Sequence, residues 1–202
     1  MRDVDGRHRP EVVVRDLRPA EAARVGELTL AAYDRYGRIE GPYRDFLADP
    51  LRRVERSTAV LVAEVGGEVA GTVSFVTPGD REWMDRPEPH GDAGFRILAV
   101  APAYEGTGIG TALVQTCIDR ARDAGAHRLL IMSMSWMHRA HDLYVRRFGF
   151  VRRPDLDVRY PSGTGVVLAL DLTADAPSRF PAVGPVPATP PWFEDVWPPR
   201  RS

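Results

Sequence analysis

The sequence predicts an α/β fold in one main domain, and three observations support this prediction. First, β-rich runs alternate with segments of helical periodicity along most of the chain. Second, the runs 58–65 and 68–76 are separated only by Gly66 and Gly67, a pair typical of tight hairpins. Third, the run 95–100 leads through a glycine-rich turn into the pattern of an amphipathic helix. A length of 202 residues allows one such domain with some residues left over.

One strand and two helices are predicted before the hairpin. A strand is predicted for residues 11–16, where three consecutive valines favour extended backbone. Pro19 then occupies a position that the first turn of a helix tolerates, and apolar residues continue at helical spacing to about Tyr36. The Gly-Pro pair at 41–42 breaks this pattern. A short aromatic helix is expected to follow and to end before Pro50.

The elements after the hairpin begin with a long loop at 77–92, which is rich in proline and glycine. The strand at 95–100 and the glycine-rich turn precede a helix that ends near Gly125 and whose inward positions include Cys117. The remaining expected elements are a strand at 128–134, a helix at 137–147, a strand near Phe150 and a strand at 166–172.

The two ends of the chain differ in composition from the part between them. Residues 1–10 are polar and charged and are expected to form a flexible leader. The segment 176–202 contains eight prolines among its last 26 residues, together with tryptophan and phenylalanine. This composition is typical of polyproline II or irregular backbone, so we expect a Pro/Trp-rich tail. The domain itself is expected to span residues 11–175.

Composition excludes several classes of function. The formal net charge of −1 gives no overall attraction to nucleic acid or to anionic membranes. Because the chain has no lysine, it can have neither a Schiff-base lysine nor the lysine of a nucleotide-binding P-loop. The single cysteine allows no intramolecular disulfide and no multi-cysteine metal site. We therefore expect no metal site. No apolar run reaches the roughly 18 to 20 residues of a membrane helix, so we expect a cytoplasmic protein.

The glycine-rich turn carries the most information about chemistry. Glycines at 106, 108 and 110 follow a strand and precede a helix. This arrangement brings bare backbone N–H groups together at a helix N-terminus, where the helix dipole favours an anion such as phosphate. A dinucleotide-binding fingerprint would need glycine at Thr111, and a P-loop would need a lysine. Both common phosphate loops are therefore poor matches.

This turn resembles the acyl-CoA loop of the GCN5-related N-acetyltransferase (GNAT) family, whose signature is Arg/Gln-x-x-Gly-x-Gly/Ala. Gly108 and Gly110 match the two glycines of that signature. The flanking preferences of the family are matched by Val100, Pro102, Tyr104, Ile109 and Leu113. A second family segment is matched downstream by Ala140, Leu143, Tyr144, Gly149 and Phe150. The order of the predicted elements agrees with the family along residues 11–172, about four-fifths of the chain.

The resemblance implies a fold, a reaction and a set of site residues. The implied fold is a mixed, mostly antiparallel central sheet flanked by helices. The implied reaction is transfer of an acetyl group from acetyl-CoA to a primary amine of a small molecule or protein, by direct attack in a ternary complex. The residues implied to bind acetyl-CoA are Leu98, Ala99, Val100, Glu105, Gly106, Thr107, Gly108, Ile109, Gly110, Thr111 and Tyr144. The backbone N–H of Val100, or else of Ala99, would polarise the thioester carbonyl, and Tyr144 would donate a proton to the leaving thiolate.

The sequence departs from the family pattern at three points. Glu105 stands where the family has Arg or Gln and places a negative charge beside the expected phosphate site. Met137 stands where Asn is common. The segment between Tyr144 and Gly149 is one residue longer than usual, which leaves the direction of the Tyr144 side chain open.

Other polar residues have more than one interpretation. Glu82 is a candidate general base, as are four further residues of the same loop: Asp85, Glu88, His90 and Asp92. Ser133 and Ser135 share one face of a strand, where they either contact the acceptor or the pantetheine arm, or are small core residues. Acceptor specificity is expected to come from the loop around Trp83 and from aromatic residues that otherwise cap the core: Tyr33, Tyr36, Tyr43 and Phe46.

Two alternative functions remain open. Beside the acetyltransferase, one alternative is a catalytically weak acyl-CoA-binding domain, which Glu105 and the shifted Tyr144 indicate. The other is an interaction protein that uses its Trp/Pro-rich tail. Members of the family often form homodimers, but nothing in this sequence indicates the oligomeric state. The acceptor amine and the preferred acyl chain are not identified by the sequence.

Overall fold

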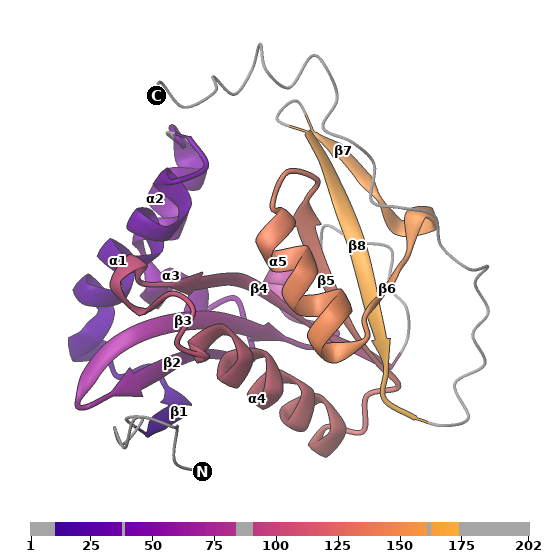
Figure 1. Ribbon diagram of the computed structural model, residues 1–202, viewed down its shortest axis with the longest axis horizontal. Coiled ribbons are helices and arrows are strands. Elements are labelled where there is room, and N and C mark those ends of the chain that lie inside the picture. Colours follow the sequence, from indigo (N-terminus) through magenta and orange to yellow (C-terminus); the bar gives the residue numbers. More distant parts are fainter. Residues whose placement is uncertain (1–10, 38, 84–90, 161–162, 174–202) are drawn as a thin grey trace, which may run out of the picture.

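The computed structural model describes residues 11–37, 39–83, 91–160 and 163–173, which form one mixed sheet with helices on both faces (Figure 1). The strand order is β1-β2-β3-β4-β5-β8-β6, with β7 paired to β8. Every pair is antiparallel except β4 with β5. The strands are β1 (Val12–Asp16), β2 (Ala59–Val65), β3 (Glu68–Val76), β4 (Asp92–Val100), β5 (Arg128–Met134), β6 (Val151–Arg152), β7 (Val158–Tyr160) and β8 (Gly163–Asp171). The predicted mixed, mostly antiparallel α/β fold is confirmed.

The helices connect these strands at the expected places. The α-helices are α1 (Ala22–Asp34), α2 (Pro42–Ala48), α3 (Pro50–Val54), α4 (Ile109–Asp123) and α5 (His138–Asp142). The short helices are η1 (Pro19–Glu21), η2 (Arg81–Trp83), η3 (Pro102–Tyr104), the π-helical turn η4 (Leu143–Arg147) and η5 (Pro154–Leu156). The predicted helix at 137–147 is thus one α-helical segment that continues as a π-helical turn.

Alternation along β2 shows how the layers are arranged. Leu61 and Ala63 pack in the main core together with residues of α4, whereas Val62 packs against Val25 and Leu28 of α1. Because successive side chains of a strand point to opposite faces, α1 and α4 cover opposite faces of the sheet. The central strands are therefore buried on both sides, and the core extends across the whole thickness of the domain.

One α-helix and one strand were not expected from the sequence, apart from short 3-10 turns. Pro50 was interpreted as the end of a helix, but it begins α3, where the side chain of Asp49 accepts a hydrogen bond from the Arg52 N–H (3.0 Å). Proline is well suited to the first turn of a helix, so the same residue ends one helix and starts the next. The second missed element is the three-residue strand β7, which pairs with the start of β8. β4 also begins three residues earlier than predicted.

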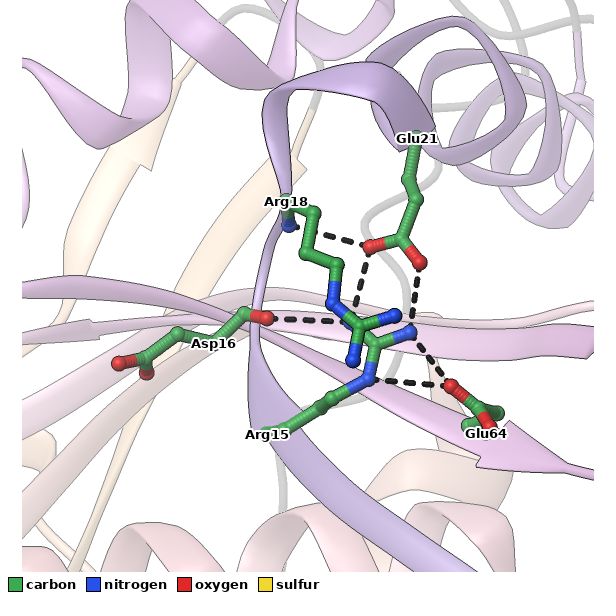
Figure 2. A network of polar contacts seen from close by, with 5 residues as sticks. All are labelled: Arg15, Asp16, Arg18, Glu21 and Glu64. Carbon is green, nitrogen blue, oxygen red and sulfur yellow. Dashed lines mark hydrogen bonds and ion pairs between the residues drawn. The ribbon is translucent and has the colours of Figure 1, made fainter. Parts of the chain in front are cut away.

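A polar network fixes the connection from β1 to α1 (Figure 2). The Arg15 guanidinium donates hydrogen bonds to Glu64 on the adjacent strand and to both carboxylate oxygens of Glu21 at 2.6 and 2.8 Å. Glu21 also accepts a hydrogen bond from the Arg18 N–H at 3.0 Å. These hydrogen bonds lower the pKa of Glu21 to about 2. The N-terminal strand is thereby held at the edge of the sheet next to the first helix.

β4 and β5 separate after a short parallel ladder, which ends at the pair Phe95–Ile131. In Figure 1 the two strands start close together and then diverge. Beyond this point the pairing of β4 with β3 shifts between Thr72 and Ser74, and Ile97 has a φ of 51°. A β-branched residue at positive φ is strained, and a bulge of this kind redirects a strand. The bulge therefore turns the last part of β4 away from β5 and opens a gap in the sheet.

Two further observations concern the described residues only. None of their helices is long and apolar enough to span a bilayer. No group of three or more His, Cys, Asp or Glu side chains among them is arranged to hold a metal ion. The predicted leader 1–10 and tail 176–202, and the candidate bases Asp85, Glu88 and His90, lie outside the described residues.

Candidate functional site

A cleft of about 1430 Å³ opens where β4 and β5 diverge. Its walls come from the end of α1, the second half of β4, the loop before α4, the C-terminal half of β5, and α5 with its π-helical continuation. All eleven residues that the resemblance implied for acetyl-CoA binding line this cleft, and so does Ser133. The structure thus brings together residues that lie between positions 98 and 144 of the chain.

The loop before α4 provides a set of backbone N–H groups. Gly106 and Gly108 have φ values of 74° and 97°, which are left-handed conformations that favour glycine. The Ala112 N–H makes the first hydrogen bond of the helix, to the carbonyl of Gly108 at 2.9 Å. The N–H groups of the three residues between them, 109–111, therefore have no acceptor within the helix and are directed out of its N-terminus. This end of α4 favours an anion.

Gly110 lies where the start of α4 meets two other elements, with room for a Cβ atom in ordinary van der Waals contact. A Cβ atom at this position would lie 3.4 Å from the Leu143 side chain and 3.8 Å from Val100. The start of α4 thus touches both β4 and the π-helical turn across the cleft floor. A longer side chain at position 110 would enter the cleft or push these elements apart.

The register of β4 identifies the direction of its last N–H groups. Ala101 donates to the carbonyl of Ala70 on β3 at 2.9 Å, and Val100 is the partner of Gly71. In an antiparallel pair, N–H groups of successive residues point to alternate edges, so the Val100 N–H points away from β3. On that side β5 has already diverged. The Val100 amide therefore faces the gap, whereas the Ala99 amide faces β3.

Tyr144 lies on the opposite wall of the cleft. Its side chain is almost fully buried and packs against Phe95 and Phe150, with ring centroids 5.7 and 5.9 Å away. Burial raises the pKa of the phenol above its ordinary value, so the hydroxyl keeps its proton throughout the physiological range. Tyr144 is thus a hydrogen-bond donor held rigidly by two aromatic neighbours.

The extra residue between Tyr144 and Gly149 is accommodated by the π-helical turn. Leu143–Arg147 follow π-helical geometry, and the Phe150 N–H donates to the carbonyl of Tyr144 at 3.1 Å. A π-helical turn holds one more residue than an α-helical turn, which is why such insertions often appear as single π turns. The extra residue is accommodated after Tyr144, and the side chain of Tyr144 lines the cleft. The direction that the sequence left open is settled in this way.

Glu105 carries no isolated negative charge. Its carboxylate pairs with the Arg35 guanidinium, at the end of α1, and with Arg139 Nη1 on α5 at 3.2 Å. The two arginines come from opposite walls of the cleft and meet at the loop before α4. The charge that departed from the family pattern is thereby compensated by residues from two other elements.

The described part of the cleft lining is basic overall. Its charged side chains are Arg35, Arg96, Arg139, Arg147 and Glu105, with no aspartate and no histidine among them. The protein as a whole has a net charge of −1. The cleft therefore concentrates positive charge that the overall composition conceals, and it suits an anionic ligand.

The candidate base Glu82 lies behind the cleft wall and not in its described lining. Its carboxylate is almost fully buried and pairs with Arg56 at 2.7 Å and with Arg96 at 3.2 Å. Asp92 lies at the other end of β4, where it pairs with Arg128 at 3.0 Å, and burial raises its pKa. Of the partners of Glu82, Arg96 lines the cleft.

The two serines of β5 have different surroundings. Ser133 lines the cleft, is almost fully buried, and its Oγ has no hydrogen-bond partner. Ser135 is fully buried and outside the cleft lining. Cys117 is fully buried in the core, and burial raises the pKa of its thiol, so it is an inert core residue.

Three functional candidates were missed by sequence reasoning: Arg35, Arg96 and Arg139. Nothing in their local sequence distinguishes them from the other arginines of this arginine-rich chain. A further contact between distant segments is the packing of Tyr36 against Trp136, with ring centroids 5.1 Å apart. Pairs between segments so distant in the chain leave no periodic signal.

Comparisons with known proteins identify the family of the chain. The sequence profile of the acetyltransferase (GNAT) family matches residues 24–150. A GNAT family acetyltransferase from Brucella melitensis, solved in complex with acetyl-CoA, is 26% identical with a TM-score of 0.55, covering 83% of this chain and 92% of that one. No curated protein is significantly similar in sequence.

Two further solved structures share the fold at lower identity. The protein yncA from Salmonella typhimurium, solved with its cofactor acetyl-CoA, is 24% identical with a TM-score of 0.59, covering 82% of this chain and 96% of that one. The ribosomal-protein-S18-alanine N-acetyltransferase from Escherichia coli is 16% identical with a TM-score of 0.60, covering 84% and 99%. The family profile spans more than half of the sequence and includes both the glycine loop and Tyr144. The chain therefore belongs to the GNAT family of acetyltransferases.

Proposed function

We propose that this protein transfers an acetyl group from acetyl-CoA to a primary amine of a small molecule or protein. One observation carries the proposal: the free N–H groups at the start of α4 open into a cleft whose described lining holds four arginines and one glutamate. A phosphorylated thioester fits such a site, because its phosphates match the N–H groups and the positive charge. The Brucella melitensis relative, solved with acetyl-CoA, supports this assignment.

The glycine loop and the gap in the sheet would hold the co-substrate. The N–H groups of residues 106–111 would bind the diphosphate, while Leu98 to Val100 on β4 would accompany the pantetheine arm. Acetyl-CoA supplies the activated acetyl group as a thioester. Domain limits of 11–175 include all of these residues and are part of the proposal.

The Val100 N–H would polarise the thioester carbonyl. Its direction follows from the register of β4, and no strand pairs with it on that side. A fixed backbone donor in a partly buried cleft stabilises negative charge that develops on an oxygen without having to reorganise. The N–H of Ala99 is directed toward β3 and cannot take this role.

Tyr144 would donate a hydrogen bond to the departing sulfur. Its raised pKa makes the phenol a weaker acid than an ordinary tyrosine, so the proton stays on Oη until negative charge develops on the sulfur. The packing of its ring against Phe95 and Phe150 fixes the position of Oη.

The neutral acceptor amine would attack the thioester carbon directly, so that a C–N bond forms and the C–S bond breaks. The proton that the nitrogen loses balances the one that Tyr144 gives to the sulfur, and CoA leaves as the free thiol. The only cysteine of the chain is buried in the core and is not available as an intermediate acetyl carrier. Ser133 Oγ, unpartnered in the cleft wall, can accept a hydrogen bond from the incoming amine. Glu82 would act on the acceptor through Arg96, which it pairs with, rather than by touching the amine.

The alternative of a catalytically weak acyl-CoA-binding domain rested on the charge of Glu105 and on the shifted Tyr144, whose side chain lines the cleft. Pairing of Glu105 with two arginines removes the reason for expecting a disabled site. The alternative of an interaction protein rested on the tail, which lies outside the described residues. We therefore favour the acetyltransferase.

Calorimetric titration with acetyl-CoA tests the proposal first. We expect binding by the wild-type protein and its loss in Gly108→Trp, because the indole would block the N–H groups. Gly79→Trp is a matched control: Gly79 has a φ of 100°, close to the 97° of Gly108, and nothing lies within 4 Å of a Cβ there. Both variants carry the same backbone strain, so only the first should lose binding. A folded wild-type protein that ignores acetyl-CoA would overturn the proposal.

The reaction itself is tested by thiol release in the presence of a panel of amines. We expect release of free CoA to depend on the amine, with the acetyl group recovered on nitrogen. Binding of acetyl-CoA without turnover of any amine in the panel would instead support the catalytically weak acyl-CoA-binding domain.

A further inference from the structure

The geometry points to Arg35 and Arg139 as ligands of the phosphate groups of acyl-CoA, with Glu105 as the counter-ion that these phosphates displace. This inference rests on the proposed function and adds two side chains to the backbone groups of the glycine loop. It also gives Glu105, an acidic residue beside an anion site, a physical role. The observations behind it are the ion pairs, the charge of the cleft lining and the exposure of the side chains.

The two arginines converge on one carboxylate from opposite walls. Arg35 follows α1 and Arg139 lies on α5, and both reach Glu105 in the loop that precedes the start of α4. Two positive charges share one negative charge, so the group retains a net charge of +1. Arg147 also lines the cleft. An anion at the glycine loop therefore lies close to positive charge that Glu105 compensates only in part.

Phosphate is a better partner for these guanidinium groups than a single carboxylate. A phosphate monoester carries about −1.5 to −2 charges and three strong acceptor oxygens, and a diphosphate presents several such oxygens together. The planar fork of arginine binds such groups with two parallel hydrogen bonds. Exchange of Glu105 for phosphate thus keeps the arginines paired and adds charge complementarity.

The exchange requires little reorganisation. The Arg139 side chain is 78% exposed, so its pair with Glu105 is of the kind that contributes little to stability. The Arg35 and Glu105 side chains are 28% and 27% exposed and are held near the loop. Arg139 can therefore turn toward an incoming phosphate while Arg35 keeps the position it already has. In the absence of acyl-CoA, Glu105 keeps both arginines next to the site.

Calorimetric titration of full-length variants with acetyl-CoA tests this exchange. We expect a five- to tenfold weaker Kd for Arg35→Ala and for Arg139→Ala, and a Kd about threefold tighter for Glu105→Gln, in which no counter-ion must be displaced. Arg146→Ala is the control, because Arg146 is an exposed neighbour of the same segment that pairs with Asp142 and does not line the cleft. Its Kd should stay within twofold of the wild-type value. Arg139→Lys, which keeps the charge without the fork, should fall between wild type and Arg139→Ala.

Dephospho-CoA distinguishes the phosphates. If Arg139→Ala weakens acetyl-CoA but leaves dephospho-CoA unchanged, Arg139 binds the 3′-phosphate; if both ligands weaken equally, it binds the diphosphate. Added salt should weaken binding to the wild type more than to the double variant Arg35→Ala/Arg139→Ala, because charge pairs are screened. Thermal unfolding of each variant checks that the fold is retained.

Two results would overturn the inference while the proposed function stands. One is wild-type binding of acetyl-CoA with both arginine variants behaving like Arg146→Ala. The other is weaker binding by Glu105→Gln, which would make Glu105 a ligand instead of a counter-ion. Failure of the folded wild type to bind acetyl-CoA is a different outcome and overturns the proposed function together with this inference.

Discussion

The two ends of the cleft present different kinds of chemical group: backbone N–H groups at one end and side chains at the other. At the glycine-loop end, one continuous stretch of chain from Leu98 to Thr111 presents backbone N–H groups. At the other end, where we propose that the acceptor binds and which we call the acceptor end, the groups are side chains: Tyr33 of α1, Tyr36 just after it, Arg96 of β4 and Ser133 of β5. Glu82 pairs with Arg96 from behind. A function performed by the backbone depends on where glycines allow the chain to turn. A function performed by side chains depends on which distant elements the fold brings together.

Removal of one backbone N–H without a change of fold tests most directly whether the backbone, and not a side chain, acts at the glycine-loop end. Val100→Pro deletes the amide that faces the gap, and it costs no hydrogen bond to β3 because that amide points the other way. We expect kcat to fall by about 100-fold or more, the usual effect of losing one such donor. Val100→Ala keeps the N–H and should keep most of the activity. Steady-state kinetics of both variants decide the matter: equal losses would mean that the side chain, and not the amide, is needed.

The α5 wall, shared by both ends, gives a prediction about pH and stability. Burial lowers the pKa of His141 on this helix from 6.5 to about 4, with further lowering by His138 and Arg152. Because the folded pKa is below the unfolded one, the unfolded state binds more protons between pH 4 and 6.5, and stability is lost as the pH falls through this range. We expect the free energy of unfolding to drop by about 2 kcal/mol between pH 7 and pH 5.

Urea denaturation at several pH values measures this loss. Glu21, whose pKa is lowered from 4.5 to about 2, titrates below this window and does not contribute to it. His141→Leu should remove most of the pH dependence, and His138→Leu should leave most of it in place, because burial and not His138 is the main cause of the lowered pKa of His141. An unchanged slope in His141→Leu would show that another group is responsible.

A smaller effect is expected from Tyr144, the side chain on the wall opposite the glycine loop that we propose as the donor to the departing sulfur. Tyr144→Phe keeps the ring packed against Phe95 and Phe150 and removes only the hydroxyl. We expect kcat to fall about tenfold with little change in the KM for acetyl-CoA, since the lost hydrogen bond matters when the sulfur departs. Tyr160→Phe is the control, because its hydroxyl reaches Met132 Sδ at 3.5 Å and lies outside the cleft lining. An unchanged kcat in Tyr144→Phe would remove this residue from the mechanism.

The smallest effect is expected at the acceptor end. Glu82→Gln removes the charge that holds Arg96 while leaving a side chain of the same size. We expect the KM for the acceptor to rise roughly three- to fivefold with kcat nearly unchanged, as for a group that positions another. Glu64→Gln is the matched control, since Glu64 pairs with Arg15 at the far edge of the sheet. Loss of the acidic limb of the pH profile of kcat/KM would instead make Glu82 the general base.

The comparison also explains which features were predictable. The hairpin at Gly66 and Gly67 and the start of α4 at Gly108 were expected correctly, and all of these glycines have positive φ. Such a backbone conformation is a local demand that glycine meets at lowest cost, so it leaves a mark in the sequence. The stretch from Leu98 to Thr111, which the resemblance implied for acetyl-CoA binding, could be recognised in the sequence for the same reason.

Other features had no local mark. Pro50 is compatible with the end of one helix and with the start of the next, and only packing against neighbouring helices selects α3. The direction of Tyr144 depended on whether the inserted residue formed a π-helical turn. Glu105 appeared as an unfavourable charge because its partners, Arg35 and Arg139, lie far from it along the chain.

The sequence by itself determined the α/β order of elements, the glycine loop and the family of the protein, because each depends on residues that are close together in the chain. The tertiary structure decided the charge of the cleft, the partners of Glu105 and Glu82, and the edge of β4 that carries the Val100 amide. These depend on which segments meet in space and in which register. Ion pairs and strand registers are set by the packing of the whole domain, so residue type and local spacing do not reveal them.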